Sequence, residues 1–278
     1  MVSNPKLDLG LARIAHLNWE FEMESISRGV SKSSGVQSYQ DCELGRWLHG
    51  QGIKTYSKVE GTHPLVGAHR DFHEAAKRLV QVCQCEGDSS NIDKELQIVR
   101  RLSRDIIFHL TEMELDSLEY RQEKSIPKRP TRSLFQRIFS GPFSALPKDH
   151  GTLEVSQARL IHLRWSRNLT NAFRHWGKDT NLESADMCAL GVWIHATGLQ
   201  QYRNLPEITQ LDEAHKAFHD HASTTLRALR HKQLKRAEEN YGKTLDFSRK
   251  VIYLLSVIEF KLLDSDNIQR TKSFLSND

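Results

Sequence analysis

The stretch Ala-His-Arg-Asp-Phe-His, residues 68–73, places two histidines four positions apart. Residues four apart on an α-helix share a face, so both imidazoles can reach one ion. A histidine and a cysteine precede this pair, and the same order of His, Cys, His, His recurs later with gaps of 26, 27 and 4 residues in both sets. The two sets are His16, Cys42, His69 and His73, and His162, Cys188, His215 and His219.

Each set supplies three imidazole nitrogens and one thiolate. This borderline-soft combination suits Zn²⁺, which readily accepts four protein ligands in a tetrahedron. We therefore expect these eight residues to be metal ligands, with two Zn²⁺ per chain as the cofactor. When all four positions are taken by protein, none is left for water or substrate, which argues against a hydrolytic zinc enzyme.

The residues around the expected ligands repeat as well. A single histidine on an apolar helix face is usually a satisfied core residue. Here, however, His16-Leu-Asn-Trp19 recurs as His162-Leu-Arg-Trp165, and Cys42-Glu-Leu-Gly-Arg-Trp47 recurs as Cys188-Ala-Leu-Gly-Val-Trp193. The offset is 146 residues in each case. Two equivalent metal-binding domains are therefore predicted.

These motifs resemble the bacterial chemoreceptor zinc-binding (CZB) domain family, whose pattern is His-x-Trp, then Cys-x-Leu-Gly-x-Trp, then His-x-x-x-His. The resemblance covers roughly residues 7–120 and 153–265. It implies a cytoplasmic helical bundle that holds one zinc through three His and one Cys. It also implies a sensory or regulatory module of chemoreceptors or diguanylate cyclases, so a protein partner of that signalling type is expected.

Length and composition fit this interpretation. The 278 residues suffice for about two domains of ordinary size, and 38% hydrophobic with 27% charged residues is a normal globular balance. A net charge of +4 is too small to indicate nucleic-acid binding. The N-terminus lacks a basic region followed by an apolar stretch, and the longest apolar run, residues 251–258, is too short to cross a bilayer. We therefore expect no signal peptide or transmembrane helix and a cytoplasmic location.

The four cysteines do not form a disulfide framework, since Cys42 and Cys188 are expected metal ligands. A reducing cytoplasm fits this usage. Cys83 and Cys85 form a Cys-x-Cys pair that the second copy lacks, and a separate redox or metal role for them is an open alternative.

Apolar periodicity predicts an all-α fold, with two four-helix-bundle domains that each carry a short accessory helix. The first helix is expected over residues 7–28, with His16 in its inward stripe, and the last helix of the first domain over 91–120. The expected domains are 7–120 and 151–265, and a basic, proline-containing linker covers 121–150. The matching last helices differ by 145 residues, so one residue is missing from the preceding turn.

A short helix is expected to begin near Asp41, which places the Cys42 thiol at a helix N-terminus, where the helix dipole favours the thiolate. Gly45 and Gly191 follow the cysteines by three residues and are expected to permit close backbone approach. Six other histidines are interpreted as unmatched between the copies, and His63 as a solvated turn residue before Pro64. The six are His49, His109, His175, His195, His221 and His231.

The pattern of apolar and basic residues in the linker predicts a short amphipathic helix. It would cap a bundle groove or, alternatively, dock on a membrane or partner. Its apolar residues are Leu134, Phe135, Ile138, Phe139 and Phe143, beside Arg132 and Arg137. A flexible linker of about thirty residues has a root-mean-square reach of about 30 Å. The two domains are therefore expected to pair within one chain as a pseudo-twofold pair.

The leading functional hypothesis is a non-enzymatic sensor or regulator that responds to zinc or to oxidation of the thiolates. The alternative is a structural scaffold or adaptor for protein–protein interaction, in which zinc clamps each bundle. A catalytic function is disfavoured, because the sequence has no phosphate-cradling Gly-rich loop, nucleophile elbow or paired-carboxylate motif.

Overall fold

The computed structural model describes residues 9–31, 35–57, 59, 61–85, 88–125, 151–174 and 183–275. The chain divides into two compact units, residues 1–123 and 124–278. All regular structure in the described residues is helical, which confirms the predicted all-α class.

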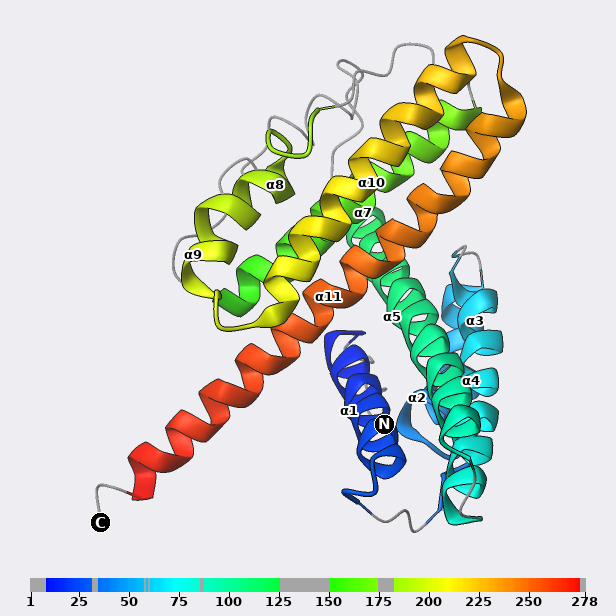
Figure 1. Cartoon of the computed structure of the whole chain (residues 1–278), viewed down its shortest axis with the longest axis vertical. Coiled ribbons are helices and arrows are strands. Elements are labelled where there is room, and N and C mark those ends of the chain that lie inside the picture. Colours follow the sequence, from blue (N-terminus) through cyan, green and yellow to red (C-terminus); the bar gives the residue numbers. More distant parts are fainter. Residues whose placement is uncertain are drawn as a thin grey trace. The chain divides into compact units, whose positions relative to one another are not determined.

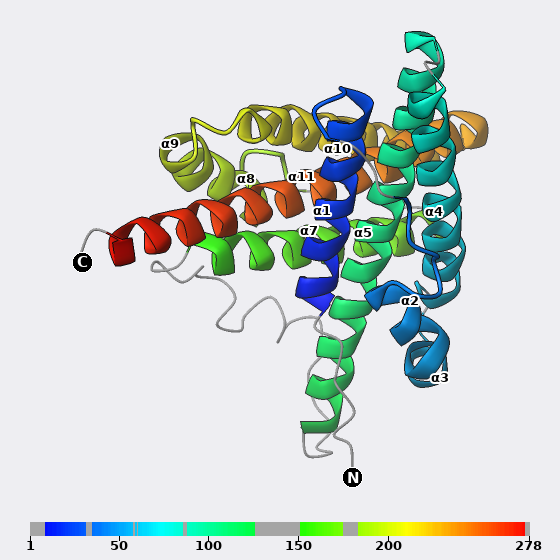
Figure 2. The same ribbon diagram turned by 90° about the horizontal axis from the view of Figure 1, so that it is seen from below.

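The first unit is built from three long helices and one short helical segment. The long helices are α1 (Leu9–Ser27), α4 (Thr62–Gln84) and α5 (Ser89–Ser125). The short segment consists of α2 (Glu43–Trp47), the π-helical turn η1 (Leu48–Gly52) and α3 (Ile53–Tyr56). Figures 1 and 2 show α1, α4 and α5 running alongside one another, with α2 beside α4.

The second unit repeats this order. Its long helices are α7 (Gly151–Arg174), α10 (Pro206–Arg230) and α11 (Leu234–Leu275). Its short segment consists of α8 (Ala189–Trp193), the π-helical turn η3 (Ile194–Gly198) and α9 (Leu199–Gln201). The helix α11 packs against both α10 and α7, and its C-terminal part extends beyond them (Figure 1).

The expected inward stripes form the cores. In α1 the residues Ala12, His16, Met23 and Ile26 are buried, and Trp19 packs against the core of the first unit. Six residues at helical spacing on the inner face of α4, and the six at the matching positions of α10, are all buried. They are Leu65, His69, Phe72, His73, Ala76 and Val80, and Leu211, His215, Phe218, His219, Ala222 and Leu226. Helical periodicity therefore identified the faces that position the expected ligands.

A buried ion pair joins the first and last helices of each unit. Arg13 Nη1 lies 2.7 Å from Glu114 Oε2, and Arg159 Nη1 lies 2.5 Å from Glu259 Oε2. Both arginine side chains are essentially inaccessible. The glutamates are 25% and 11% exposed, so removal of the glutamate, which leaves the buried arginine without this partner, would be the more destabilising change.

Helix boundaries differ from the expectation in two places. The helix α4 begins at Thr62, so His63 and Pro64 belong to its first turn, where the missing proline N–H needs no helical partner. His63 is exposed, as expected. The helix α5 continues to Ser125, five residues beyond its expected end at Tyr120. The expected amphipathic helix around residues 134–143 lies outside the described residues.

Candidate metal centres

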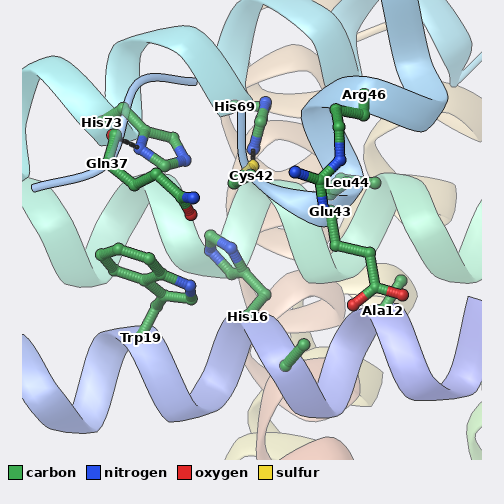
Figure 3. Close-up of a pocket in the computed structure, with 11 residues that line it drawn as sticks. Ala12, His16, Trp19, Gln37, Cys42, Glu43, Leu44, Arg46, His69 and His73 are labelled. Carbon is green, nitrogen blue, oxygen red and sulfur yellow. Dashed lines mark hydrogen bonds between the residues drawn. The ribbon is translucent and has the colours of Figure 1, made fainter. Parts of the chain in front are cut away.

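One buried cysteine and two buried histidines converge in the first unit. Cys42 is the N-cap of α2, and His69 and His73 lie one turn apart on the inner face of α4. One ligand atom from each lies within 4.8 Å of the others. Figure 3 shows the two imidazoles and the sulfur facing a common space.

The second unit contains the same group. One ligand atom each from Cys188, His215 and His219 lies within 4.8 Å of the others, and all three residues are buried. Cys188 is the N-cap of α8, and both histidines come from α10. Three residues of each predicted set of four are therefore brought together.

Backbone carbonyls orient the second histidine of each pair. His73 Nδ1 lies 2.8 Å from the Gln37 carbonyl oxygen (Figure 3), and His219 Nδ1 lies 3.0 Å from the Glu183 carbonyl oxygen. A carbonyl can only accept, so the imidazole N–H donates to it and the lone pair of the neutral ring is on Nε2. Such partners typically fix the ring of a metal-bound histidine.

The glycines after the cysteines shape the turn that presents the sulfur. The Gly45 N–H donates to Cys42 Sγ at 3.3 Å, and the Gly191 N–H donates to Cys188 Sγ at 3.4 Å. A Cβ at position 45 would lie 1.8 Å from the Tyr39 carbonyl oxygen, and one at position 191 would lie 1.7 Å from that of Ala185. The predicted close backbone approach is thereby confirmed.

Burial keeps the histidines of both groups neutral. It lowers the pKa of His69 and of His215 to about 3, with smaller contributions from the neighbouring imidazoles. Burial also lowers the pKa of His73 and His219. Neutral imidazoles have the lone pairs that a metal ion requires.

Two effects act in opposite directions on the thiols. Burial raises the pKa of Cys42 and Cys188, and the N–H groups at the starts of α2 and α8 only partly offset this effect. The helix N-terminus therefore favours the thiolate, as expected, but in the metal-free protein burial outweighs this effect and the net pKa is raised. A bound cation would supply the charge that favours deprotonation.

The first-helix histidines lie next to these groups but outside the 4.8 Å clusters. His16 lines a cavity of about 270 Å³ together with Cys42, His69 and His73, and its ring projects from α1 toward them (Figure 3). Among the described residues, its buried Nε2 has no hydrogen-bond partner. In the second unit, His162 Nε2 lies 3.2 Å from Ser248 Oγ. Their role as fourth ligands stays a prediction.

Aromatic rings pack around the imidazoles in both units. Trp19 lies 5.6 Å from His73 and Trp165 lies 4.6 Å from His219, measured between ring centroids. Phe72 and Phe218 contact His16 and His162 at 4.3 Å and 4.5 Å. These contacts cover part of each imidazole with aromatic ring surface.

Sequence reasoning missed one repeated histidine. His49 and His195 are also separated by 146 residues and occupy the second position of the π-helical turns η1 and η3, so the interpretation of both as unmatched is wrong. Each lies close enough to His69 or His215 to lower the pKa of that ring slightly. His195 Nε2 also lies 3.2 Å from Asp212 Oδ1.

The donor geometry fits a zinc ion. With Zn–S near 2.3 Å and Zn–N near 2.0 Å, a tetrahedral site separates sulfur from nitrogen by about 3.5 Å. The observed separations are 3.2 Å for Cys42 Sγ to His69 Nε2 and 3.3 Å for Cys188 Sγ to His215 Nε2. Buried, neutral imidazoles beside a thiol form a set that a borderline-soft divalent cation prefers. Together, fold and site define an all-α protein with one His/Cys metal centre in each of two helical units.

The comparisons with known proteins agree with this class. Residues 16–80 and 162–226 each match the family model described as the chemoreceptor zinc-binding domain. The chain therefore carries two copies of the chemoreceptor zinc-binding domain, a family that binds zinc, and each copy supplies a Cys-His-His group that can hold one ion. No curated protein and no solved structure matches the chain. Within the described residues, none of the helices has the length and apolarity needed to span a membrane.

Proposed function

We propose that this chain is a non-enzymatic zinc-binding sensory or regulatory protein of bacterial signalling that acts in the cytoplasm. The observation that carries the proposal is the presence of two matching sets of buried donors within two copies of a signalling-associated zinc domain. In this proposal, His16 and His162 complete the two sets as fourth ligands. Each centre then holds one Zn²⁺ through three histidines and one cysteine.

The positions of the donors suggest how zinc occupancy would alter the structure. His16 belongs to α1, Cys42 caps α2, and His69 and His73 belong to α4. Bound Zn²⁺ would crosslink these elements through four protein ligands. Its loss would free the short segment α2–η1–α3 from α4, and a partner protein would read that difference in packing.

Oxidation of the thiolate is a second route to the same change. Cysteine is the one member of the donor set that a peroxide converts to a poor ligand: the thiolate and hydrogen peroxide yield a sulfenic acid and hydroxide. Cys42 and Cys188 are buried, whereas Cys85 is exposed, so an oxidant in solution also meets a competing thiol.

The proposed partner is a signalling protein of the chemoreceptor or diguanylate cyclase type.

Reversibility distinguishes a sensor from a zinc-clamped scaffold. The purified chain is equilibrated with buffers of fixed free zinc, and bound metal is measured across the nanomolar to picomolar range. A sensor should change its occupancy within this range and exchange zinc in minutes, and peroxide should release zinc from a Cys83→Ser, Cys85→Ser chain. Zinc that is retained in every buffer and after oxidation would instead favour the scaffold.

A further inference from the structure

Each unit contains a buried serine at a matching position of its last helix. Ser103 in α5 and Ser248 in α11 are 145 residues apart, and both are fully buried. Ser248 Oγ lies 3.2 Å from His162 Nε2, across the bundle. The sequence contains the repeat as Ser103-Arg104 and Ser248-Arg249, but nothing in the pattern links it to the metal centre.

Most hydroxyl groups buried in these helices are satisfied differently. Thr111, Thr244 and Ser256 donate to the carbonyl four residues earlier in their own helix. This local bond is the usual solution for a hydroxyl within a helix. Ser248 instead bonds across to α7, and Ser103 has no hydrogen-bond partner among the described residues.

The two units show the same pair of atoms in two arrangements. In the second unit His162 Nε2 and Ser248 Oγ bond to each other, whereas in the first unit both His16 Nε2 and Ser103 Oγ are buried without a hydrogen-bond partner among the described residues. A buried imidazole nitrogen without a partner is costly. His16 in this arrangement lines the cavity that it shares with Cys42, His69 and His73.

We propose that Ser103 and Ser248 are placeholder partners for the fourth zinc ligand. In the metal-free domain the serine hydroxyl donates to Nε2 of the first-helix histidine, and zinc takes over the same nitrogen when it binds. The released hydroxyl can then turn back to its own helix, as Thr244 and Ser256 do. This inference rests on the proposed role of His16 and His162 as fourth ligands.

As a consequence, each domain should bind zinc less tightly than it would without the serine hydroxyl. Because zinc binding must break the serine–histidine bond, the hydroxyl stabilises the metal-free domain relative to the loaded one. One neutral hydrogen bond contributes about 1 kcal/mol net, which is about fivefold in affinity, so its removal should tighten zinc binding about threefold to tenfold. A serine that instead held the histidine on the metal would have the opposite effect, since loss of such partners typically weakens metal binding about 10–100-fold.

The test uses the full-length chain with Cys42→Ser, so that zinc binding reports on the second site. Zinc affinity is measured by competition with a chromophoric chelator for Ser248→Ala and for the control Thr244→Val, which deletes a buried hydroxyl bonded to its own helix. Ser248→Ala should raise the affinity threefold to tenfold and lower the melting temperature of the metal-free chain, and Thr244→Val should leave the affinity unchanged. An affinity that is unchanged or lower in Ser248→Ala would overturn the proposal.

Imidazole ¹⁵N NMR of the chain that retains Ser248 gives a second measurement. It does not require the Ser248→Ala variant to fold. His162 should carry its proton on Nδ1 without metal, and Nε2 should become the zinc-bound nitrogen. If zinc instead binds Nδ1 of His162 while Nε2 stays bonded to Ser248, the placeholder role of the serine is wrong. The assignment of His162 as a fourth ligand would then still stand. If zinc binds but the His162 signals do not change, the fourth-ligand assignment fails and the placeholder role fails with it. Ser103→Ala in a Cys188→Ser chain tests the matching serine and should tighten zinc binding at the first site.

Discussion

The glycine three residues after each cysteine determines whether the sulfur can reach its position. A Cβ at Gly45 would overlap the Tyr39 carbonyl oxygen at 1.8 Å, so the turn before α2 must open to accept Gly45→Ala. We expect a loss of about 2–3 kcal/mol in unfolding free energy, measured by denaturant titration, and much weaker zinc binding at the first site.

Gly67→Ala is the matched control, because Gly67 lies in α4 and a Cβ added there would meet no neighbouring atom within 4 Å. This change should stabilise the helix by about 0.5–1 kcal/mol and leave zinc binding intact. Normal zinc binding by Gly45→Ala would show that the close approach does not position the cysteine.

The neutral histidines predict how the metal-free chain responds to acid. Burial lowers the pKa of His69 and His215 to about 3, below the value of about 6.5 in the unfolded chain, so unfolding takes up protons. This contribution to stability is complete above pH 6.5 and is lost as the pH falls from 6.5 toward 3. Each such imidazole should cost about 1.4 kcal/mol per pH unit within that window.

The measurement is denaturant unfolding of the metal-free chain between pH 8 and pH 5, with fluorescence of the tryptophans as the signal. The unfolding free energy should be flat above pH 7 and should fall steeply below 6.5. An unfolding free energy that stays constant down to pH 5 would mean that these imidazoles take up protons as readily in the folded chain as in the unfolded chain.

The sequence predicted the residues of the site better than it predicted their partners. The offset of 146 residues identified Cys42, His69 and His73, because ligand chemistry restricts side-chain identity. The partner of His73 is the carbonyl of Gln37, matched by that of Glu183, and a backbone group leaves no trace in residue identity. The sequence also predicted the favourable effect of the helix N-terminus on the cysteine thiolates, but not the larger opposing effect of their burial.

At the scale of elements, the short segments are the parts that zinc should stabilise most. The segment α2–η1–α3 consists of two helices of five and four residues and a π-helical turn, so it has few helical hydrogen bonds of its own. Its donor Cys42 immediately precedes α2. Hydrogen exchange in residues 43–56 should therefore accelerate when zinc is removed, and the core of α5 should change much less.

Cys42→Ala provides this test with an internal control. In the zinc-saturated variant, residues 43–56 should exchange faster, whereas the matching residues 189–201 should keep their protection because Cys188 is intact. Equal protection of the two segments would show that zinc does not hold the short segment in place.

Helix boundaries show why sequence patterns resolve elements only approximately. The apolar stripe of the first helix identified the buried face of α1, because burial imposes a period near 3.6 residues. The ends of α4 and α5 were misplaced by a few residues, since Pro64 is tolerated in a first helical turn and the residues after Tyr120 lack an apolar signal. The π-helical turns have no sequence signature of this kind.

At the scale of the whole molecule, the prediction is that the two domains pair within one chain. Crosslinking of the monomeric fraction, followed by mass spectrometry, should give links between residues 7–120 and 151–265. Mixing ¹⁴N- and ¹⁵N-labelled chains provides the control, because links within a chain carry a single label. Links of mixed label as the dominant species would favour pairing between chains.

Each domain is predicted to hold one zinc ion through its own set of donors, and metal analysis of the folded chain measures the number of ions bound. The zinc-saturated full-length chain should contain two zinc ions, Cys42→Ala and Cys188→Ala should each contain one, and the double variant should contain none. Cys83→Ser, Cys85→Ser is the control and should retain two, since Cys83 and Cys85 lie outside both groups of donors. A folded, saturated chain with one zinc or none, or a double variant that still binds two, would contradict the account.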